Sequence, residues 1–377
     1  MRRLLPVAAA FLLVVVATVA VIQWQREPEP EIGDELARQI GQLLMVGFVG
    51  TSLDEPWPRR IVEQIEEGSV GGVLILGRNV ERLDDLRAMN RAFLEAAPDN
   101  PPLIAIDQEG GRIQRLRSLH GFPETPSAAM LGRYADPDTA RGLYATMAEA
   151  LAGLGFNVNF GPVVDLDVEP ANPIISQLQR AYAEDAPTVT AFARAFIEPH
   201  RAAGILTAPK HFPGHGSTVL DSHRVLPDIT LTWSEAELEP YRALLAEDLA
   251  DMVMVGHLVL DREGASGLPA TLSPEIVTGL LRQDLGYDGV IVTDDMDMGA
   301  ITDGHGLEEA LIAAIRAGVD LMIVSNFSRS DPDLPEALVR SIGVAAMDDE
   351  SLRARIAQSA ARIETLKRAR LRLPASN

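Results

Sequence analysis

The feature that most constrains this chain is a regular alternation between apolar runs and stretches with helical spacing. The runs occupy residues 43–48, 71–76, 102–107, 156–166, 205–212, 251–258, 289–295 and 321–326. Between them, segments such as 138–155, which opens with Asp138 as a candidate cap and closes with Gly155, have the apolar spacing of a helix. Runs that are apolar throughout indicate strands buried on both faces of a parallel sheet. Eight strand–helix repeats therefore predict an α/β fold, a (β/α)₈ barrel of the TIM type.

A doubly wound open sheet is the alternative, because periodicity alone does not show whether a sheet closes. The placement of polar residues favours the barrel. They stand at or beside the carboxyl ends of the runs, at Asp107, Asp165, Lys210, His211, His257, Asp294 and Asn326. In a barrel these ends form the active-site face. The last patterned segment, 348–370, is typical of a closing amphipathic helix.

The N-terminus is a separate element. Arg2 and Arg3 precede an apolar run over 4–22, followed by Trp24. About 20 such residues span a bilayer, and a basic pair stays on the cytoplasmic side. We therefore expect an uncleaved membrane anchor with the barrel outside the cytoplasm; a cleaved signal peptide is the alternative. The predicted division is an anchor or signal peptide over 1–25, a charged linker over 26–34 and a barrel domain over 35–377.

Composition excludes several classes of function. The 377 residues include no cysteine, which rules out disulfides, thiolate metal sites and cysteine nucleophiles. The net charge of −21 argues against a nucleic-acid partner, because phosphates require a basic surface. We expect a monomer.

The segment 210–227, "KHFPGHGSTVLDSHRVLP", carries three of the seven histidines. Lys210 and His211 end the fifth predicted strand, and a bend there would aim both at a ligand. Asp221 and His223 are two residues apart and face the same way if the loop is extended. A carboxylate beside a histidine fixes the imidazole tautomer and stabilises its protonated form, as a general acid/base requires.

Three alternatives apply to this segment. Asp221 can simply form a local turn. His211 and His215 have the spacing of a helical metal site, but the Pro and Gly between them oppose a helix. His215 can serve only to satisfy backbone groups within the loop, and we assign it to that role.

Two further strand ends carry carboxylates. Asp294, at the end of the seventh predicted strand, is placed to be a nucleophile toward an electrophilic carbon, with helix capping by Asp294 or Asp295 as the alternative. Two adjacent aspartates allow one to face the barrel mouth while the other holds the loop. Asp107 opens "DQEGGRIQR", whose alternative reading is a glycine-rich turn with solvated charges.

Together these motifs resemble the family 3 glycoside hydrolases, and within them the bacterial β-N-acetylglucosaminidases that trim peptidoglycan fragments. The resemblance covers about 36–326. The family pattern K-H-F-P-G-H-G, a short spacer, D-S-H and L-P is present in full within 210–227, and "DQEGGRIQR" and "VTDDMDM" match as well.

The resemblance implies that Asp294 is the nucleophile, that His223 is the general acid/base and that Asp221 orients His223. It implies a retaining mechanism on terminal β-linked N-acetylglucosamine, with a carbohydrate substrate and no metal or cofactor. The sugar-binding residues that it implies are Asp107, Arg115, Lys210, His211 and Arg180.

The chain departs from the family after the fourth predicted strand. The family run N-P-V-I-G-x-R-S-F-G becomes "NPIISQLQRAYAED" over 172–185, so Arg180 lies two positions late, and Ser217 replaces a common Asp. Three other functions remain open at this stage. They are a metal-dependent barrel hydrolase, a non-catalytic sugar-binding barrel, and a β-glucosidase or β-xylosidase of the same family.

Overall fold

The computed structural model describes residues 32–262 and 267–371, and its centre is one sheet of parallel strands. In chain order the strands are β1 (Leu44–Gly47), β2 (Gly72–Ile75), β3 (Leu103–Ile106), β6 (Val158–Asn159), β7 (Leu206–Thr207), β8 (Met252–Val255), β9 (Val290–Asp295) and β10 (Leu321–Val324). Their spatial order is β7-β6-β3-β2-β1-β10-β9-β8. Apart from β7 and β8, each strand lies beside the next strand of this sheet in the sequence, and the first strand, β1, lies beside the last, β10, as in a barrel.

The two outer strands of this order, β7 and β8, are joined by the residues that follow β7. Phe212 forms a parallel bridge with Val255. The Phe212 amide donates to the Met254 carbonyl at 2.8 Å, and the Gly256 amide donates to the Phe212 carbonyl at 2.9 Å. These contacts close the sheet, so the prediction of a (β/α)₈ barrel is confirmed and the open sheet is excluded.

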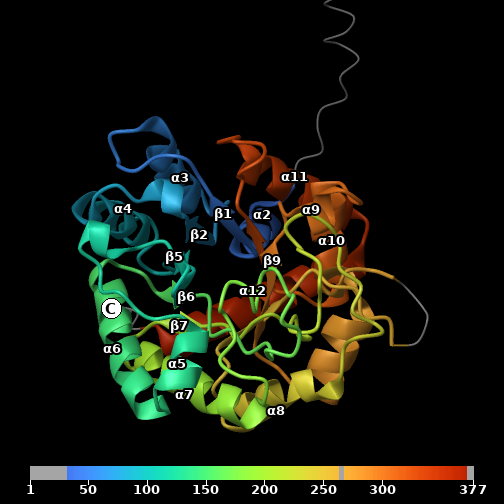
Figure 1. Ribbon diagram of the computed structural model, residues 1–377. Helices are drawn as coiled ribbons and strands as arrows, with labels where there is room; N and C mark the ends of the chain where they lie inside the picture. Colours follow the sequence, from blue (N-terminus) through green and yellow to red (C-terminus); the bar gives the residue numbers. More distant parts are fainter. Residues whose placement is uncertain (1–31, 263–266, 372–377) are drawn as a thin grey trace, which may run out of the picture. The chain divides into compact units, whose positions relative to one another are not determined.

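Helices follow the strands and surround the barrel (Figure 1). After the strands in turn come α3 (Pro56–Glu67), α4 (Leu83–Ala96), α6 (Pro137–Gly153), α7 (Ala186–Ala202), α8 (Glu239–Ala246), the π-helix η5 (Glu275–Asp284), α10 (Leu307–Ala317) and α11 (Leu334–Met347). Two more complete the shell: α2 (Asp34–Gln42) precedes β1, and α12 (Glu350–Arg370) packs against α2, α10 and α11.

Short secondary-structure elements lie in the connections that follow the carboxyl ends of the strands. They are the hairpin β4 (Gln108–Gly110) and β5 (Ile113–Gln114), the helices α5 (Ala128–Tyr134) and α9 (Gly299–Thr302), and the 3₁₀ turns η1 (Gly77–Asn79), η2 (Ser118–His120), η3 (Glu235–Leu238) and η4 (Ala270–Leu272). In Figure 1 the green and yellow-green connections between β6 and α8 cross the front of the barrel.

The helix expected over 138–155 begins and ends slightly earlier than predicted. Its cap is Asp136, whose Oδ1 accepts from the Thr139 amide at 2.8 Å, and not Asp138, which lies in the first turn. Pro137 occupies the first helical position, where its fixed φ suits the helix and its missing N–H costs nothing. The helix ends at Gly153, and Gly155 follows with φ of 86°.

The predicted anchor over 1–25 and most of the linker lie outside the described residues. Within residues 32–262 and 267–371, no helix is both long enough and apolar enough to cross a membrane.

Candidate active site

A buried lysine organises one side of the barrel mouth. Lys210, just beyond β7, places its Nζ 2.8 Å from Asp107 Oδ1 and 2.7 Å from Glu109 Oε1. Arg115 Nη2 lies 3.2 Å from the other oxygen of Asp107. Burial lowers the pKa of Lys210, but the two carboxylates raise it by more, so the ammonium stays charged. The structure thus brings together the predicted residues Asp107, Arg115 and Lys210.

Glu109 is a member of this cluster that the sequence analysis missed. Arg180 forms a bidentate ion pair with the Glu109 carboxylate, with Nε 2.9 Å from Oε2 and Nη2 2.7 Å from Oε1. Burial raises the pKa of Glu109, but Arg180 and Lys210 lower it far more, so the carboxylate is ionised. The available signal was an acidic residue inside "DQEGG", directly after a strand with no exposed residues.

The altered connection over 172–180 places Arg180 beside predicted site residues despite its shifted position. Asn172 Oδ1 accepts from the amides of Ile174 and Ile175, and the Arg180 amide donates to the Ile175 carbonyl at 2.9 Å. Gln179, with φ of 59°, takes the left-handed conformation just before Arg180. At the end of this compact turn, Arg180 Nη2 lies 3.2 Å from His211 Nε2.

Asp165 fixes His211 and the turn after it. Its Oδ2 lies 2.7 Å from His211 Nδ1, and its Oδ1 accepts from the amides of His211 and His215 at 3.1 and 2.8 Å. Burial raises the pKa of Asp165, but the contacts with His211 and His215 together lower it by more. Asp165 was placed at a strand end by the sequence, without a role; the structure gives it a supporting one.

Asp221 and His223 form a contact within a turn. His223 Nδ1 lies 2.9 Å from Asp221 Oδ1, and the same oxygen accepts from the His223 amide at 2.9 Å. The amides of Arg224 and Val225 donate to the Asp221 carbonyl, so the chain turns here and is not extended. Asp221 therefore forms both the local turn and the histidine pair, which the sequence posed as alternatives. The His223 side chain is 60% exposed, open to a ligand above the barrel.

The His215 ring hydrogen-bonds a side chain and no backbone group within the described residues, which corrects the role assigned to it. Its Nε2 lies 3.1 Å from the hydroxyl of Ser222, the residue between Asp221 and His223. Burial lowers the pKa of His215 to about 4, so this imidazole is neutral. The backbone around His215 is also held, because Asn172 Nδ2 donates to its carbonyl at 2.8 Å.

The two adjacent aspartates at the end of β9 have separate surroundings. Asp295 Oδ1 accepts from the amides of Asp297 and Ser325, and burial raises its pKa to about 6. Burial also raises the pKa of Asp294, but the imidazoles of His211, His257 and His223 lower it by more. Neither aspartate caps a helix, because Met298 stands at the N-cap of α9. Asp295 holds the loop, whereas Asp294 is an ionised carboxylate within electrostatic reach of His223.

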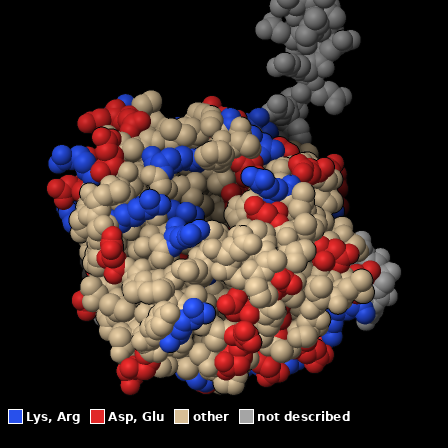
Figure 2. Space-filling model, in the orientation of Figure 1, with Lys and Arg blue, Asp and Glu red and all other residues tan. Residues whose placement is uncertain are grey.

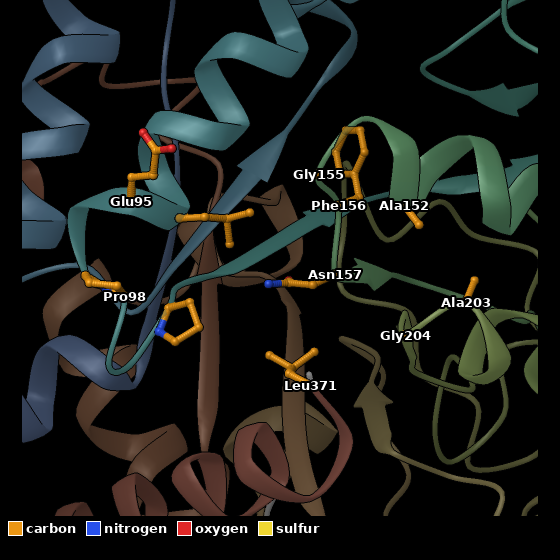
Figure 3. Close-up of a pocket in the computed structure, with 11 residues that line it drawn as sticks. Glu95, Pro98, Ala152, Gly155, Phe156, Asn157, Ala203, Gly204 and Leu371 are labelled. Atoms are coloured by element: carbon orange, nitrogen blue, oxygen red, sulfur yellow. The ribbon is translucent and has the colours of Figure 1, made fainter. Parts of the chain in front are cut away.

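This end of the barrel is hollowed. Figure 2 shows a depression near the middle of the face, with Lys and Arg side chains on one side of it and both basic and acidic side chains on the other. A separate cavity of about 440 Å³ is lined by Pro101, Asn157 and Gly204, which precede β3, β6 and β7 at the opposite end of the barrel (Figure 3). Among its lining residues in the described part of the chain only Glu95 is acidic, so it lacks the paired groups of the mouth.

A barrel that gathers ion-paired polar groups, a carboxylate and an Asp–His pair at its strand ends has the layout of a barrel glycosidase. Residues 35–366 match the Glycosyl hydrolase family 3 N terminal domain. The chain belongs to this family and is a glycoside hydrolase.

Named relatives agree with this placement. Beta-hexosaminidase A of Pseudoalteromonas piscicida is 33% identical over 334 residues, which cover 82% of this chain and 55% of that protein. Beta-hexosaminidase of Alkalilimnicola ehrlichii is 34% identical over 298 residues, covering 77% of this chain and 82% of that protein. The chain thus spans about half of the first relative and most of the second.

Solved structures show the same fold. A family 3 beta-N-acetylglucosaminidase from Paenibacillus sp. superposes with a TM-score of 0.79 at 34% identity, covering 89% of this chain and 62% of that one. A beta-N-acetylhexosaminidase from Beutenbergia cavernae gives a TM-score of 0.76 at 31% identity, covering 88% and 98%.

Proposed function

We propose that this glycoside hydrolase is a retaining exo-β-N-acetylglucosaminidase that removes terminal β-linked N-acetylglucosamine. The observation that carries the proposal is the Asp221–His223 contact of 2.9 Å, on a loop that reaches the segment following Asp294. The relatives named beta-hexosaminidase support the choice of sugar.

In the first step, protonated His223 gives its proton to the glycosidic oxygen while Asp294 attacks the anomeric carbon. The bond to the leaving sugar breaks, and a glycosyl ester forms on Asp294. Asp294 suits the role of nucleophile in this step, because its lowered pKa keeps its carboxylate ionised near neutral pH.

In the second step, neutral His223 takes a proton from water, the water attacks the anomeric carbon, and the ester to Asp294 breaks. Two inversions leave the configuration retained. Asp221 accepts the hydrogen bond from Nδ1 of His223, which orients Nε2 toward the reacting oxygen and stabilises the imidazolium.

The ion-paired cluster would hold the terminal sugar. Asp107, Lys210, His211 and Arg180 are fixed by contacts with one another and with their supporting carboxylates, so they are preorganised for hydroxyl groups. Arg115 joins this cluster through its Nη2, which lies 3.2 Å from Asp107 Oδ2.

The natural substrate that we propose is a peptidoglycan-derived muropeptide with a terminal N-acetylglucosamine. The supporting observation is the group of Lys and Arg side chains on one side of the hollow in a chain of net charge −21, because muropeptides carry carboxylates. The test is turnover of nitrophenyl β-N-acetylglucosaminide, β-glucoside and β-xyloside. Faster cleavage of the first supports the proposal, and preference for the glucoside or xyloside would replace it with the other specificities of the family.

We also propose that residues 1–25 anchor the enzyme to the cytoplasmic membrane with the barrel outside. The support is the apolar run after Arg2 and Arg3, which is about one bilayer in length. Fractionation of cells that express the full chain tests this, since recovery in the cytoplasm contradicts it. Deletion of the first thirty or so residues should yield a soluble, active enzyme.

A further inference from the structure

Phe327 is an aromatic residue that packing does not explain. It follows β10 at the carboxyl end of the barrel, and 70% of it is exposed. A large exposed aromatic ring at a barrel mouth is a recurrent element of ligand-binding sites.

The ring is backed by a fixed cation. The guanidinium carbon of Arg78 lies 5.3 Å from the centre of the Phe327 ring. Arg78 is itself held, because its Nε donates to the Phe48 carbonyl at 2.8 Å and its Nη2 donates to the Ser325 carbonyl at 2.7 Å. Arg78 therefore covers part of the ring, and the remaining exposure leaves a face available to a ligand.

The loop that carries Phe327 is also fixed. Asp297, whose side chain is only 2% exposed, accepts from the amides of Phe327 and Ser328 at 2.9 Å each. Arg329 pairs with the same carboxylate at 2.9 Å. An exposed ring on an immobilised loop is preorganised, so little conformational entropy is lost when a ligand stacks on it.

Phe327 and His223 are held by one short segment. That segment begins at Asp294, binds the Phe327 amide through Asp297, and donates from the Gly299 amide to the His223 carbonyl. The leaving sugar is the part of the substrate that must lie against His223. Because the backbone of Phe327 is bound to the same segment, we expect the Phe327 ring to lie near that sugar.

We propose that Phe327, backed by Arg78, is a stacking platform for the pyranose ring of the leaving sugar. The proposal rests on the proposed function, because it requires a sugar as the leaving group. The apolar C–H face of a pyranose would lie on the free part of the ring, and binding there would orient the glycosidic oxygen toward His223.

The experiment compares two substrates that share the terminal sugar and differ in the leaving group. One is the β-1,4-linked disaccharide of N-acetylglucosamine, and the other is β-N-acetylglucosaminyl fluoride, whose leaving group has no ring. Phe327→Ala should lower kcat/KM for the disaccharide about fivefold to tenfold and leave kcat/KM for the fluoride unchanged. Phe327→Trp should restore the disaccharide value, whereas Phe327→Leu should not.

The matched control is Tyr134, at the end of α5. It is also an exposed aromatic residue, 72% exposed, with Arg133 6.0 Å from its ring centre. Tyr134→Ala should change neither substrate. The stacking proposal would be wrong, with the proposed function unaffected, in either of two cases. In the first, Phe327→Ala has the wild-type kcat/KM for the disaccharide. In the second, it loses kcat/KM equally for the disaccharide and the fluoride. A wild-type enzyme that cleaves neither substrate would overturn the proposed function, and the platform with it.

Discussion

The backbone amide of Gly299 lies 3.2 Å from the carbonyl oxygen of His223 and donates a hydrogen bond to it. The next amide, that of Ala300, donates to the Ser222 carbonyl at 3.3 Å. These contacts join the loop after β7, which carries the proposed acid/base, to the segment that follows the proposed nucleophile Asp294. The relative position of the two catalytic groups therefore depends on how closely these two segments approach.

Substitution of Gly299 should disturb that approach. A Cβ at this position would lie 2.9 Å from the carbonyl oxygens of both His223 and Arg224, so Gly299→Ala must displace the loop. General acid assistance is worth about 10²–10⁴-fold, and partial misplacement of His223 should forfeit about tenfold or more. We expect kcat to fall for a disaccharide and much less for a dinitrophenyl glycoside, which needs little protonation.

The control for Gly299→Ala is Gly304→Ala, because Gly304 lies in the same connection and a Cβ there meets nothing within 4 Å. Gly304→Ala should match the wild type. If Gly299→Ala affects both leaving groups equally, the contact serves the fold and does not position His223.

Glu109 should be needed for both stability and sugar binding. Glu109→Gln removes the carboxylate that pairs with buried Arg180 and one of the two carboxylates that pair with Lys210, and leaving a buried charge unpaired costs about 3–5 kcal/mol. We expect a lower free energy of unfolding and a higher KM, measured by urea unfolding and by initial rates. Glu124→Gln is the control, because this residue in the same connection is exposed and its carboxylate accepts a hydrogen bond from the Ser118 hydroxyl. Unchanged stability in Glu109→Gln would show that the two cations find other partners.

The barrel could be predicted because the information for it is local. Continuous apolar runs and the polar residues that end them, such as Asp107 and Asp294, are visible in single stretches of sequence. The lengths of the strands were harder to predict from the sequence. Strand β7 is only Leu206–Thr207, because the residues after it leave the regular hydrogen-bond ladder and close the barrel through Phe212. A one-dimensional pattern does not show where a ladder is interrupted.

The supporting contacts could not be predicted because they join distant segments. Glu109 and Arg180 are 71 positions apart, and their pairing depends on the turn that the 172–180 connection adopts. The contact of His215 with Ser222 is nearer in sequence, but it requires a loop folded back on itself rather than extended. The motifs thus predicted the candidate catalytic residues, whereas the contacts that hold these residues in position could be identified only from the fold.

Buried Glu237 should make stability depend on pH. Its Oε2 accepts from the Gly216 amide at 3.3 Å, and burial, followed by the charge of Asp165, raises its pKa from 4.5 to about 8. Between these values the native state keeps a proton that the unfolded chain loses. The stability that protonated Glu237 contributes is therefore complete below about pH 4.5 and is lost as pH rises toward 8.

Glu237→Gln cannot ionise, so its free energy of unfolding should fall less than that of the wild type between about pH 5 and pH 8. Urea unfolding of both proteins at these two pH values measures the difference. Parallel changes in the two proteins would mean that Glu237 is ionised in the native state.

The last prediction separates the nucleophile from the acid/base. Asp294→Asn keeps the size of the side chain but removes the attacking charge, so no glycosyl-enzyme should form with any leaving group. His223→Ala should instead lose about 10²–10⁴-fold with a disaccharide but far less in the first step with a nitrophenyl glycoside. Its second step lacks a base, so the intermediate should accumulate as a burst of nitrophenol and a mass increase on the peptide that contains Asp294. Asp221→Ala should resemble a milder His223→Ala, because the imidazole remains without its orienting carboxylate. If His223→Ala shows no burst and loses both substrates equally, His223 binds the substrate or supports the loop, and another group is the proton donor.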